Sequence, residues 1–284
     1  MPNATLKRPL VKPRRISIRR PDLHYADETL PKYFVADDLV RSHIAAMLSA
    51  VFPEGEDFFV RSVRAYRDEI TDPELKDQVK GFIGQEALHG REHRAFNDRL
   101  RKLGYPTRLT DRRVKLALTV IGKVAPQRHQ LAITAALEHY TATLAEVILR
   151  DDAARGEFTS DEVRTLFTWH ALEETEHKSV AYDVFQHVCG DRRVRVGTMY
   201  GVHIGFLFAM STSVAISLAL DPRARDPRRL ARSLRGLRSH PFFKGDVIRR
   251  LRDYDRADFH PDDHDTAALL ERWSAELGDM KAVS

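Results

Sequence analysis

The sequence predicts an all-α protein in which four long helices form a central bundle and further helices surround it. Apolar residues recur with helical spacing over most of the chain, and no alternating strand pattern runs for more than a few residues. Two copies of a Glu-x-x-His pattern fall on two of the expected long helices. The chain has 284 residues, of which 43% are hydrophobic, so it can bury a large core.

The N-terminal residues 1–27 combine four prolines with many arginines, which predicts a basic, extended or disordered segment with a short ordered arm at Ile16–Ile18. We expect residues 28–284 to form a single helical domain. This domain is expected to contain a core with the candidate metal ligands at about 54–190, an apolar helix at about 196–220 and a basic helical extension at about 223–284.

Prolines and capping residues predict the helix boundaries. Pro53 is expected to end the first helix, because proline lacks the N–H that the helix ladder needs. Asp72 and Pro73 suit the cap and first turn of another helix. In chain order the pattern predicts helices over about 36–51, 54 or 56 to 70, 73–103, 112–124, 126–154, 160–188, 230–237 and 266–277.

The apolar segment 196–220 contains one ionisable residue, His203, and is long enough to cross a bilayer. Arginines flank it on both sides, so charge predicts no orientation. We expect a buried central helix, which could also lie at a homodimer interface. A membrane span or a shallow membrane insertion is the alternative, and it would make the protein membrane-associated.

The formal net charge is +5, and the basic residues cluster in the first twenty positions and between Arg223 and Arg252. We interpret these clusters as solvated surfaces, with anionic lipid, nucleic acid or an acidic partner as alternatives. No nucleic-acid-binding module is recognisable, so no specific nucleic-acid partner is expected. The lone Cys189 excludes an intrachain disulfide and a thiolate metal cluster, and it suits a reducing, cytoplasmic location.

The candidate chemistry lies in acidic residues where a bundle core should be apolar. Glu86 with His89, and Glu174 with His177, are each three residues apart and so lie on one helix face. Single glutamates, Glu56 and Glu138, each precede one of these pairs by about the length of a helical hairpin. One Glu from each of two helices and Glu-x-x-His from each of two others is the ligand pattern of dinuclear iron or manganese bundles.

Each of these residues also has a simpler interpretation as a solvated helix charge. Glu56 competes with Glu54 as a carboxylate near a helix N-terminus, and Glu174 competes with Glu173 and Glu176. Glu138 is the hardest to dismiss, because it interrupts the apolar run 131–137, where an unpaired carboxylate would be costly to bury.

His170 is a seventh candidate ligand, because it lies four residues before Glu174 on the same face, although a surface histidine is an equal alternative. Glu173 or Asp183 could orient the histidine ligands. His139 and His93, which neighbour candidate ligands, are further positioning candidates. The cluster 259–264 contains two histidines, but its proline favours a structured loop over a metal site.

The segments FPEGEDFF, GQEALHGREH, ALEHYTA, WHALEETEHKSVAYDV and DYDRADFHPDD resemble the bacterial family of predicted metal-dependent hydrolases, which is placed in the ferritin-like superfamily. The resemblance runs from about Ile16 to Asp265 and implies a ferritin-like four-helix bundle. The ligand pattern is also similar to that of the di-iron arylamine N-oxygenases, whose extra histidine matches His170. Together these resemblances imply seven ligands: Glu56, Glu86, His89, Glu138, His170, Glu174 and His177.

Two departures narrow the function. His93 stands where the small subunit of ribonucleotide reductase carries its radical tyrosine, so a tyrosyl radical is not expected. Ferritins are shorter and lack the apolar segment, so iron storage is not expected either.

Three functions remain open. The first is an O2-activating oxygenase or oxidase with two iron ions, or manganese, which acts on a small organic and hydrophobic, lipid-like substrate and requires an electron donor. The second is a two-metal hydrolase in which Glu173 or His139 acts as a base. The third is a metal-binding helical protein without catalytic activity.

Overall fold

A computed structural model of the protein describes residues 16–24, 30–278 and 281–282. This described part is mostly helical, and its strands are two residue pairs, β1 (Arg19–Arg20) and β2 (Lys281–Ala282), which pair antiparallel. The prediction of an all-α fold is confirmed. The extended or disordered character expected for most of 1–27 falls largely outside the described residues.

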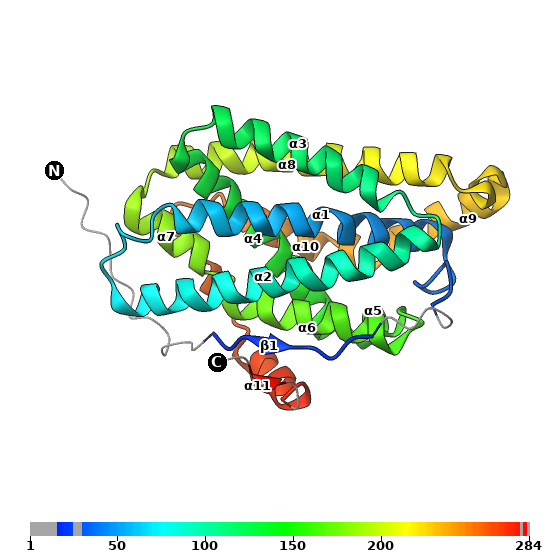
Figure 1. Ribbon diagram of the computed structural model, residues 1–284, viewed down its shortest axis with the longest axis horizontal. Coiled ribbons are helices and arrows are strands. Elements are labelled where there is room, and N and C mark those ends of the chain that lie inside the picture. Colours follow the sequence, from blue (N-terminus) through cyan, green and yellow to red (C-terminus); the bar gives the residue numbers. More distant parts are fainter. Residues whose placement is uncertain (1–15, 25–29, 279–280, 283–284) are drawn as a thin grey trace.

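Four long helices surround a common core (Figure 1). They are α1 (Leu39–Arg64), α2 (Pro73–Lys102), α4 (Gln127–Arg150) and α6 (Asp161–His177). The first of them packs on α2 and α4, and α6 packs on the same two helices from the other side. This arrangement brings together the inward faces of the four helices that carry the predicted ligands.

The remaining helices extend or cover this core. Two of them, α3 and α8, lie along one side of the molecule, where both pack on α1 and where α8 also packs on α4 (Figure 1). The bounds of the additional helices are α3 (Thr107–Val124), α5 (Asp152–Gly156), α7 (Val180–Val188), α8 (Arg192–Ala219), α9 (Pro227–Gly236), α10 (Gly245–Asp253) and α11 (Ala267–Glu276), with short 3-10 turns η1 (Pro222–Arg225), η2 (Leu237–Ser239), η3 (Pro241–Phe243) and η4 (Pro261–Asp263).

Pro53 does not end the first helix, so the prediction of two separate helices before residue 70 was wrong. The helix α1 runs through Pro53 without interruption. Proline deprives the carbonyl of Ser49, four residues earlier, of its ladder partner. The side chain of Asn97 on α2 replaces that partner, because its Nδ2 donates to the Ser49 oxygen at 3.0 Å. A tertiary contact therefore satisfies the group that the sequence pattern leaves unpaired.

Other boundaries also differ from the predictions. The single helix expected over 160–188 is interrupted at Lys178 and Ser179, where α6 passes into α7. Both residues keep right-handed helical backbone angles, so the chain direction changes little. The helix α3 begins five residues before the predicted start, and the expected helix over 126–154 ends earlier, with α5 following as a separate turn. The pattern did not predict α10.

The apolar segment is not a buried central helix. In α8, Ile204 is 74% exposed and Phe208 is 67% exposed, while Met199 and Val202 face the bundle. Among the described residues this is the one helix long and apolar enough to cross a membrane, judged by length and composition alone, and only 17% of its most apolar stretch is buried. The helix therefore lies on the outside of the protein.

The N-terminal arm packs against the bundle. Ile16 and Ile18 lie on α2 at two glycines, Gly81 and Gly84, where an added Cβ would collide with the two isoleucine side chains. The absence of a side chain at these glycines lets the arm lie directly on the helix surface. This contact brings residues 17–19 close to the bundle core.

Candidate metal centre

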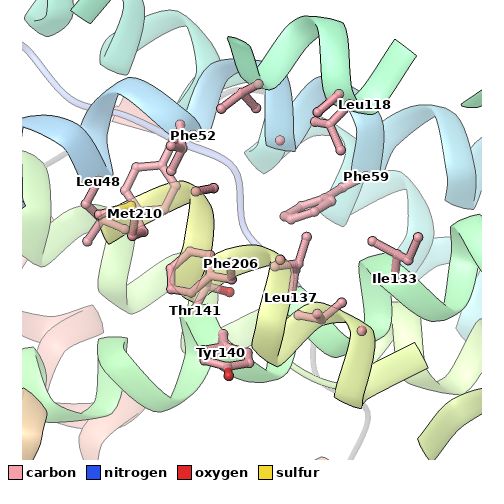
Figure 2. Close-up of a pocket in the computed structure, with 18 of the residues that line it drawn as sticks. Leu48, Phe52, Phe59, Leu118, Ile133, Leu137, Tyr140, Thr141, Phe206 and Met210 are labelled. Atoms are coloured by element: carbon pink, nitrogen blue, oxygen red, sulfur yellow. The ribbon is translucent and has the colours of Figure 1, made fainter. Parts of the chain in front are cut away.

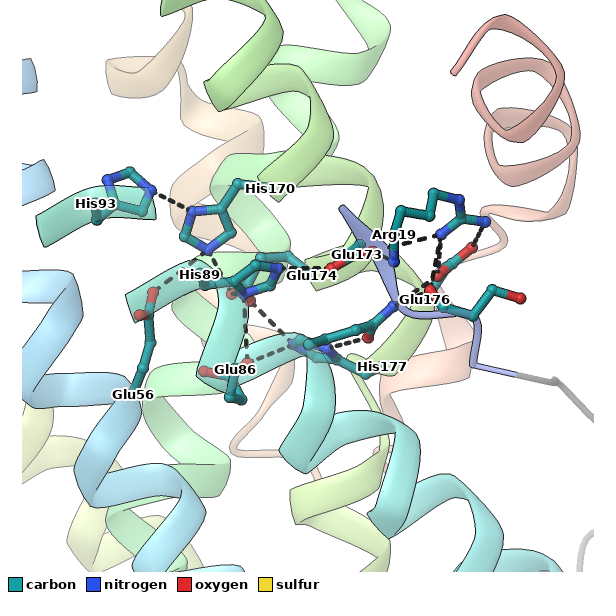
Figure 3. Close-up of polar contacts among 12 residues, drawn as sticks. Arg19, Glu56, Glu86, His89, His93, His170, Glu173, Glu174, Glu176 and His177 are labelled. Carbon is teal, nitrogen blue, oxygen red and sulfur yellow. Dashed lines mark hydrogen bonds and ion pairs between the residues drawn. The ribbon is translucent and has the colours of Figure 1, made fainter. Parts of the chain in front are cut away.

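The seven side chains predicted as metal ligands come together in the middle of the four packed helices, and Figure 3 labels all of them except Glu138. The helix α1 supplies one of them, α2 two, α4 one and α6 three. All are buried, with at most 3% of any residue exposed. They are Glu56, Glu86, His89, Glu138, His170, Glu174 and His177. Their burial argues against the alternative of solvated helix charges.

The ligand atoms form overlapping groups. One group joins Glu56, His89 and His170, and a second joins Glu86, Glu138 and His177. A third group shares Glu86 with the second and His89 with the first, and adds Glu174. These residues could therefore hold two ions, as the ligands of dinuclear carboxylate bundles do.

Short distances join these atoms. The Nε2 atom of His177 lies 3.1 Å from Glu86 Oε1 and 3.2 Å from Glu138 Oε2. The Nε2 atom of His170 lies 2.8 Å from Glu174 Oε1 and 3.8 Å from Glu56 Oε1. Metal–ligand bonds of about 2 Å place neighbouring donor atoms about 3 Å apart, so these spacings suit a shared cation.

Many of these atoms have no hydrogen-bond partner within the described part of the chain. Both carboxylate oxygens of Glu56, Glu86 and Glu138 are in this state. So are Glu174 Oε2, His89 Nδ1 and His177 Nε2, although His177 Nε2 lies within ion-pair distance of Glu86 and Glu138. Buried polar atoms without partners are rare and costly in proteins. Here they converge on one place, so the donor set fits a metal pair.

The pKa shifts of the buried side chains in the metal-free site also fit a metal pair. Burial, together with neighbouring carboxylates, holds the pKa of Glu56 and Glu86 well above their usual range. Burial and the charge of Glu174 raise the pKa of Glu138 to about 7. Burial opposes protonation of His177, but the charges of Glu138 and Glu174 outweigh it and raise its pKa. Without metal, protons compensate these charges, so metal binding would displace protons.

Two buried groups orient the histidines of the Glu-x-x-His motifs. The Nε2 atom of His89 lies 3.0 Å from Glu173 Oε2, which leaves Nδ1 directed at the cluster. The Nδ1 atom of His177 lies 2.8 Å from Gln85 Oε1, which leaves Nε2 directed at the cluster. Contacts of this kind fix the tautomer and ring position of histidine ligands.

His170 is held by a longer chain of contacts. Its Nδ1 atom lies 2.7 Å from Nε2 of His93, whose other nitrogen lies 2.8 Å from the hydroxyl of Ser49. That hydroxyl in turn donates to Asn97 Oδ1 at 2.8 Å. The positions of His93 and Glu173 therefore agree with the positioning roles considered for them.

The N-terminal arm completes this surrounding layer (Figure 3). The backbone N–H of Arg19 donates to Glu173 Oε1 at 2.9 Å, and its guanidinium donates to both oxygens of Glu176. The side-chain amide of Gln85 donates to the Ser17 carbonyl at 3.0 Å. Sequence reasoning missed Gln85 and Arg19. Gln85 could have been suspected from its place beside Glu86, whereas no local pattern indicates Arg19.

Other candidates lie elsewhere. His139, considered as a positioning group or a base, contacts the Arg250 carbonyl through Nε2 at 2.8 Å and packs on Tyr254, away from the cluster. Asp183 contacts His260 rather than a candidate ligand. The ring of His260 accepts from the N–H of Asp262 and caps the turn η4, so this segment is a structured loop.

A large apolar cavity of about 900 Å³ reaches the cluster (Figure 2). Its walls come from α1, α3, α4 and α8, and Figure 2 shows Phe52, Phe59, Leu137 and Phe206 facing it. On the side of α6, His170 and Glu174 belong to its lining. An apolar ligand of considerable size could therefore lie beside two of the candidate ligands.

The fold and this site define a class of protein: a helical protein with a buried, carboxylate-rich site suited to a metal pair. A family model described as predicted metal-dependent hydrolase matches residues 17–265. The chain belongs to this family, so a metal-dependent enzymatic activity is indicated. No curated protein and no solved structure gave a match. The placement among ferritin-like proteins and the likeness to arylamine N-oxygenases stay predictions.

Proposed function

We propose that the protein is an O2-dependent oxidase or oxygenase with two iron ions, which acts on a hydrophobic organic substrate. One observation carries this proposal. The cavity of about 900 Å³ is lined mainly by aliphatic and aromatic side chains and leads to His170 and Glu174. A long apolar substrate placed there would present C–H bonds to the centre, and O2, which is itself apolar, enters such a cavity readily.

The ligand chemistry suits this reaction. Carboxylate and imidazole ligands favour iron or manganese over metals that prefer sulfur. Iron in this site would supply the O2 chemistry that no amino-acid side chain performs. Turnover would also need electrons from a donor.

The chain itself contributes position and exclusion of water. Glu173 and Gln85 hold the rings of His89 and His177, and the chain through His93 holds His170. Phe52 packs edge-on against His170, with ring centroids 4.6 Å apart, and both residues belong to the cavity lining. Apolar walls at this point bind the substrate and keep bulk water from the centre.

A two-metal hydrolase is the second candidate, and the family description favours it. A metal pair can bind and deprotonate a water molecule and can stabilise an oxyanion. Of the two bases considered for this reaction, His139 is directed away from the cluster. Glu173 is close, and burial raises its pKa to about 8. However, Glu173 contacts His89 and Arg19 rather than the cavity.

The test uses the purified protein loaded anaerobically with Fe(II), or in parallel with Mn(II) or Zn(II). We expect about two metal ions per chain and rapid O2 uptake by the reduced iron form, measured with an oxygen electrode. Glu86→Ala is expected to abolish metal pairing and O2 uptake. Glu54→Ala, which removes a half-buried carboxylate that pairs with the exposed Lys115, is expected to change neither.

Hydrolysis is measured in the same preparations with short-chain and long-chain p-nitrophenyl esters. Ester cleavage by the zinc or manganese form without O2 would establish the hydrolase and refute the oxidase. A folded protein that binds no metal would refute both.

A further inference from the structure

The helices α3 and α8 share an exposed apolar face. On α3 the side chains of Leu109, Leu116, Val120 and Val124 are exposed and recur every four or seven residues, so they form one stripe. On α8 the exposed Tyr200, Ile204, Leu207 and Phe208 form a second stripe with the same kind of spacing. Large contiguous apolar surfaces of this kind indicate interaction sites.

The apolar cavity lies against the two helices that carry these stripes. Both helices line the cavity, and Arg113 of α3 donates to Thr212 of α8 at 2.9 Å, which shows that the helices flank the same space. On α8 the lining includes three glycines four residues apart, Gly197, Gly201 and Gly205. All three are exposed, and an added Cβ would meet no atom within 4 Å. The glycines thus leave the cavity open along α8.

Basic residues border the apolar stripes. Arg112 lies one turn before Leu116, and Lys123 lies one turn after Val120, so both flank the stripe of α3. Arg193 lies one turn before Gly197, and both residues line the cavity. Of the eight basic residues on α3 and α8, Arg195 is buried and Lys115 pairs with Glu54. The other six, against the single acidic Asp111, leave the two helices basic.

This positive charge distinguishes two possible binding partners of the face, a second copy of the chain and a membrane surface. A second copy of the chain would bring two basic surfaces together, and like charges in contact are unfavourable. A surface with an apolar interior and anionic headgroups satisfies both the stripes and the basic border. We propose that the α3–α8 face docks on an anionic membrane surface and draws a lipid-like ligand from it into the cavity.

Docking on the surface, rather than crossing it, follows from the packing of α8. Met199, Val202, Ser213 and Ser217 on its inner face are buried within the protein, and the helix packs along α4 and α1. A membrane-spanning α8 would have to leave these contacts. The proposal does not depend on the metal chemistry, since the face contains none of the candidate ligands.

The experiment measures sedimentation of the full-length protein with vesicles. We expect binding to phosphatidylcholine vesicles that contain about one third phosphatidylglycerol, at least about tenfold tighter than binding to phosphatidylcholine alone, and a loss of this difference at high salt. Ile204→Ser with Phe208→Ser is expected to weaken binding about tenfold or more. Arg112→Gln with Lys123→Gln is expected to weaken only binding to the anionic vesicles.

Two control variants match these changes on other surfaces. Ile248→Ser with Phe243→Ser removes the same exposed side-chain types from α10 and η3, and Lys76→Gln with Lys80→Gln removes two exposed charges from α2. Both controls are expected to bind like the wild type. Glu86→Ala should also bind normally, so a failed oxidase proposal would not affect this result.

Equal binding to both kinds of vesicle, no binding at all, or equal losses in the test and control variants would overturn the proposal. Light scattering in solution tests the other occupant. A wild-type dimer that Ile204→Ser with Phe208→Ser converts to a monomer, without vesicle binding by the wild type, would show that the face joins two copies of the chain instead.

Discussion

Gly81→Ala tests whether the N-terminal arm sets the affinity of the metal site from outside it. The new Cβ would lie 2.6 Å from Ile16 Cβ and 3.2 Å from the Ile16 carbonyl oxygen. Carbon atoms in contact lie about 3.5–4.0 Å apart, so the arm must retreat by about 1 Å. Because the contact is with the backbone and Cβ, a change of side-chain rotamer cannot relieve it.

This retreat would break two hydrogen bonds. The bond from Gln85 to the Ser17 carbonyl is 3.0 Å long, and the bond from the Arg19 N–H to Glu173 is 2.9 Å long. An added displacement of about 1 Å takes both beyond hydrogen-bonding range. Glu173 and Gln85 then lose one of the contacts that hold them against the two histidines. Loss of such supporting contacts lowers metal affinity by about 10–100-fold, and we expect the lower end because both groups keep other partners.

The assay is competition between the protein and a chelator for Mn(II), combined with hydrogen exchange at the Arg19 amide. Gly122→Ala on α3 is the control, since its Cβ would meet only Gln130 Oε1 at 3.9 Å. It is expected to leave metal affinity unchanged and to stabilise the helix by up to about 1 kcal/mol. Fast exchange at Arg19 with unchanged affinity would show that the arm does not support the site.

Three further predictions concern the buried carboxylates and the cavity. Burial and the charge of Glu174 raise the pKa of Glu138 from about 4.5 to about 7, so its ionisation destabilises the metal-free protein as pH rises through this range. Glu138→Gln should therefore increase the free energy of unfolding of the metal-free protein by up to about 3 kcal/mol at pH 8 and little at pH 4, in urea titrations; equal changes at both pH values would contradict this. Asp221 is buried, but contacts that include Lys32 Nζ at 2.9 Å outweigh burial and lower its pKa to about 2. The ionised Asp221 stabilises the folded protein fully above about pH 4, and this contribution disappears as pH falls towards 2. Asp221→Asn should therefore lower the free energy of unfolding by about 2 kcal/mol at pH 7 and by much less at pH 2. Gly201→Leu should obstruct the cavity and weaken binding of a fluorescent fatty acid about tenfold at unchanged metal content; unchanged binding would place the apolar ligand elsewhere.

The sequence contained enough information for the fold class and for the choice of candidate ligands. Helical periodicity is a local property, and the all-α prediction depends on little else. The two Glu-x-x-His pairs are also local, because three residues of helix place their side chains on one face. The spacing of Glu56 and Glu138 from the two Glu-x-x-His pairs predicted that the four helices bring these side chains to the same depth in the bundle. The structure does bring them together.

Only the tertiary structure decided the features that depend on distant segments. The continuity of α1 through Pro53 needs Asn97, which lies 44 residues later in the chain. The exposure of α8 likewise depends on how many helices cover it, which the sequence does not show. Its apolar composition alone therefore led to the wrong prediction of a buried helix. Composition shows that a segment is apolar, but it does not show what the segment touches.

The same limit applies to the surroundings of the metal site. His139 neighbours Glu138 in sequence, yet one helix position turns its side chain away from the cluster. Arg19 and Gln85 reach the site because the arm lies on two glycines of α2. Helical periodicity therefore predicted the candidate metal ligands that the structure brings together. Packing between segments far apart in the chain decided which groups orient them and where the cavity opens, because such contacts leave no periodic pattern in the sequence.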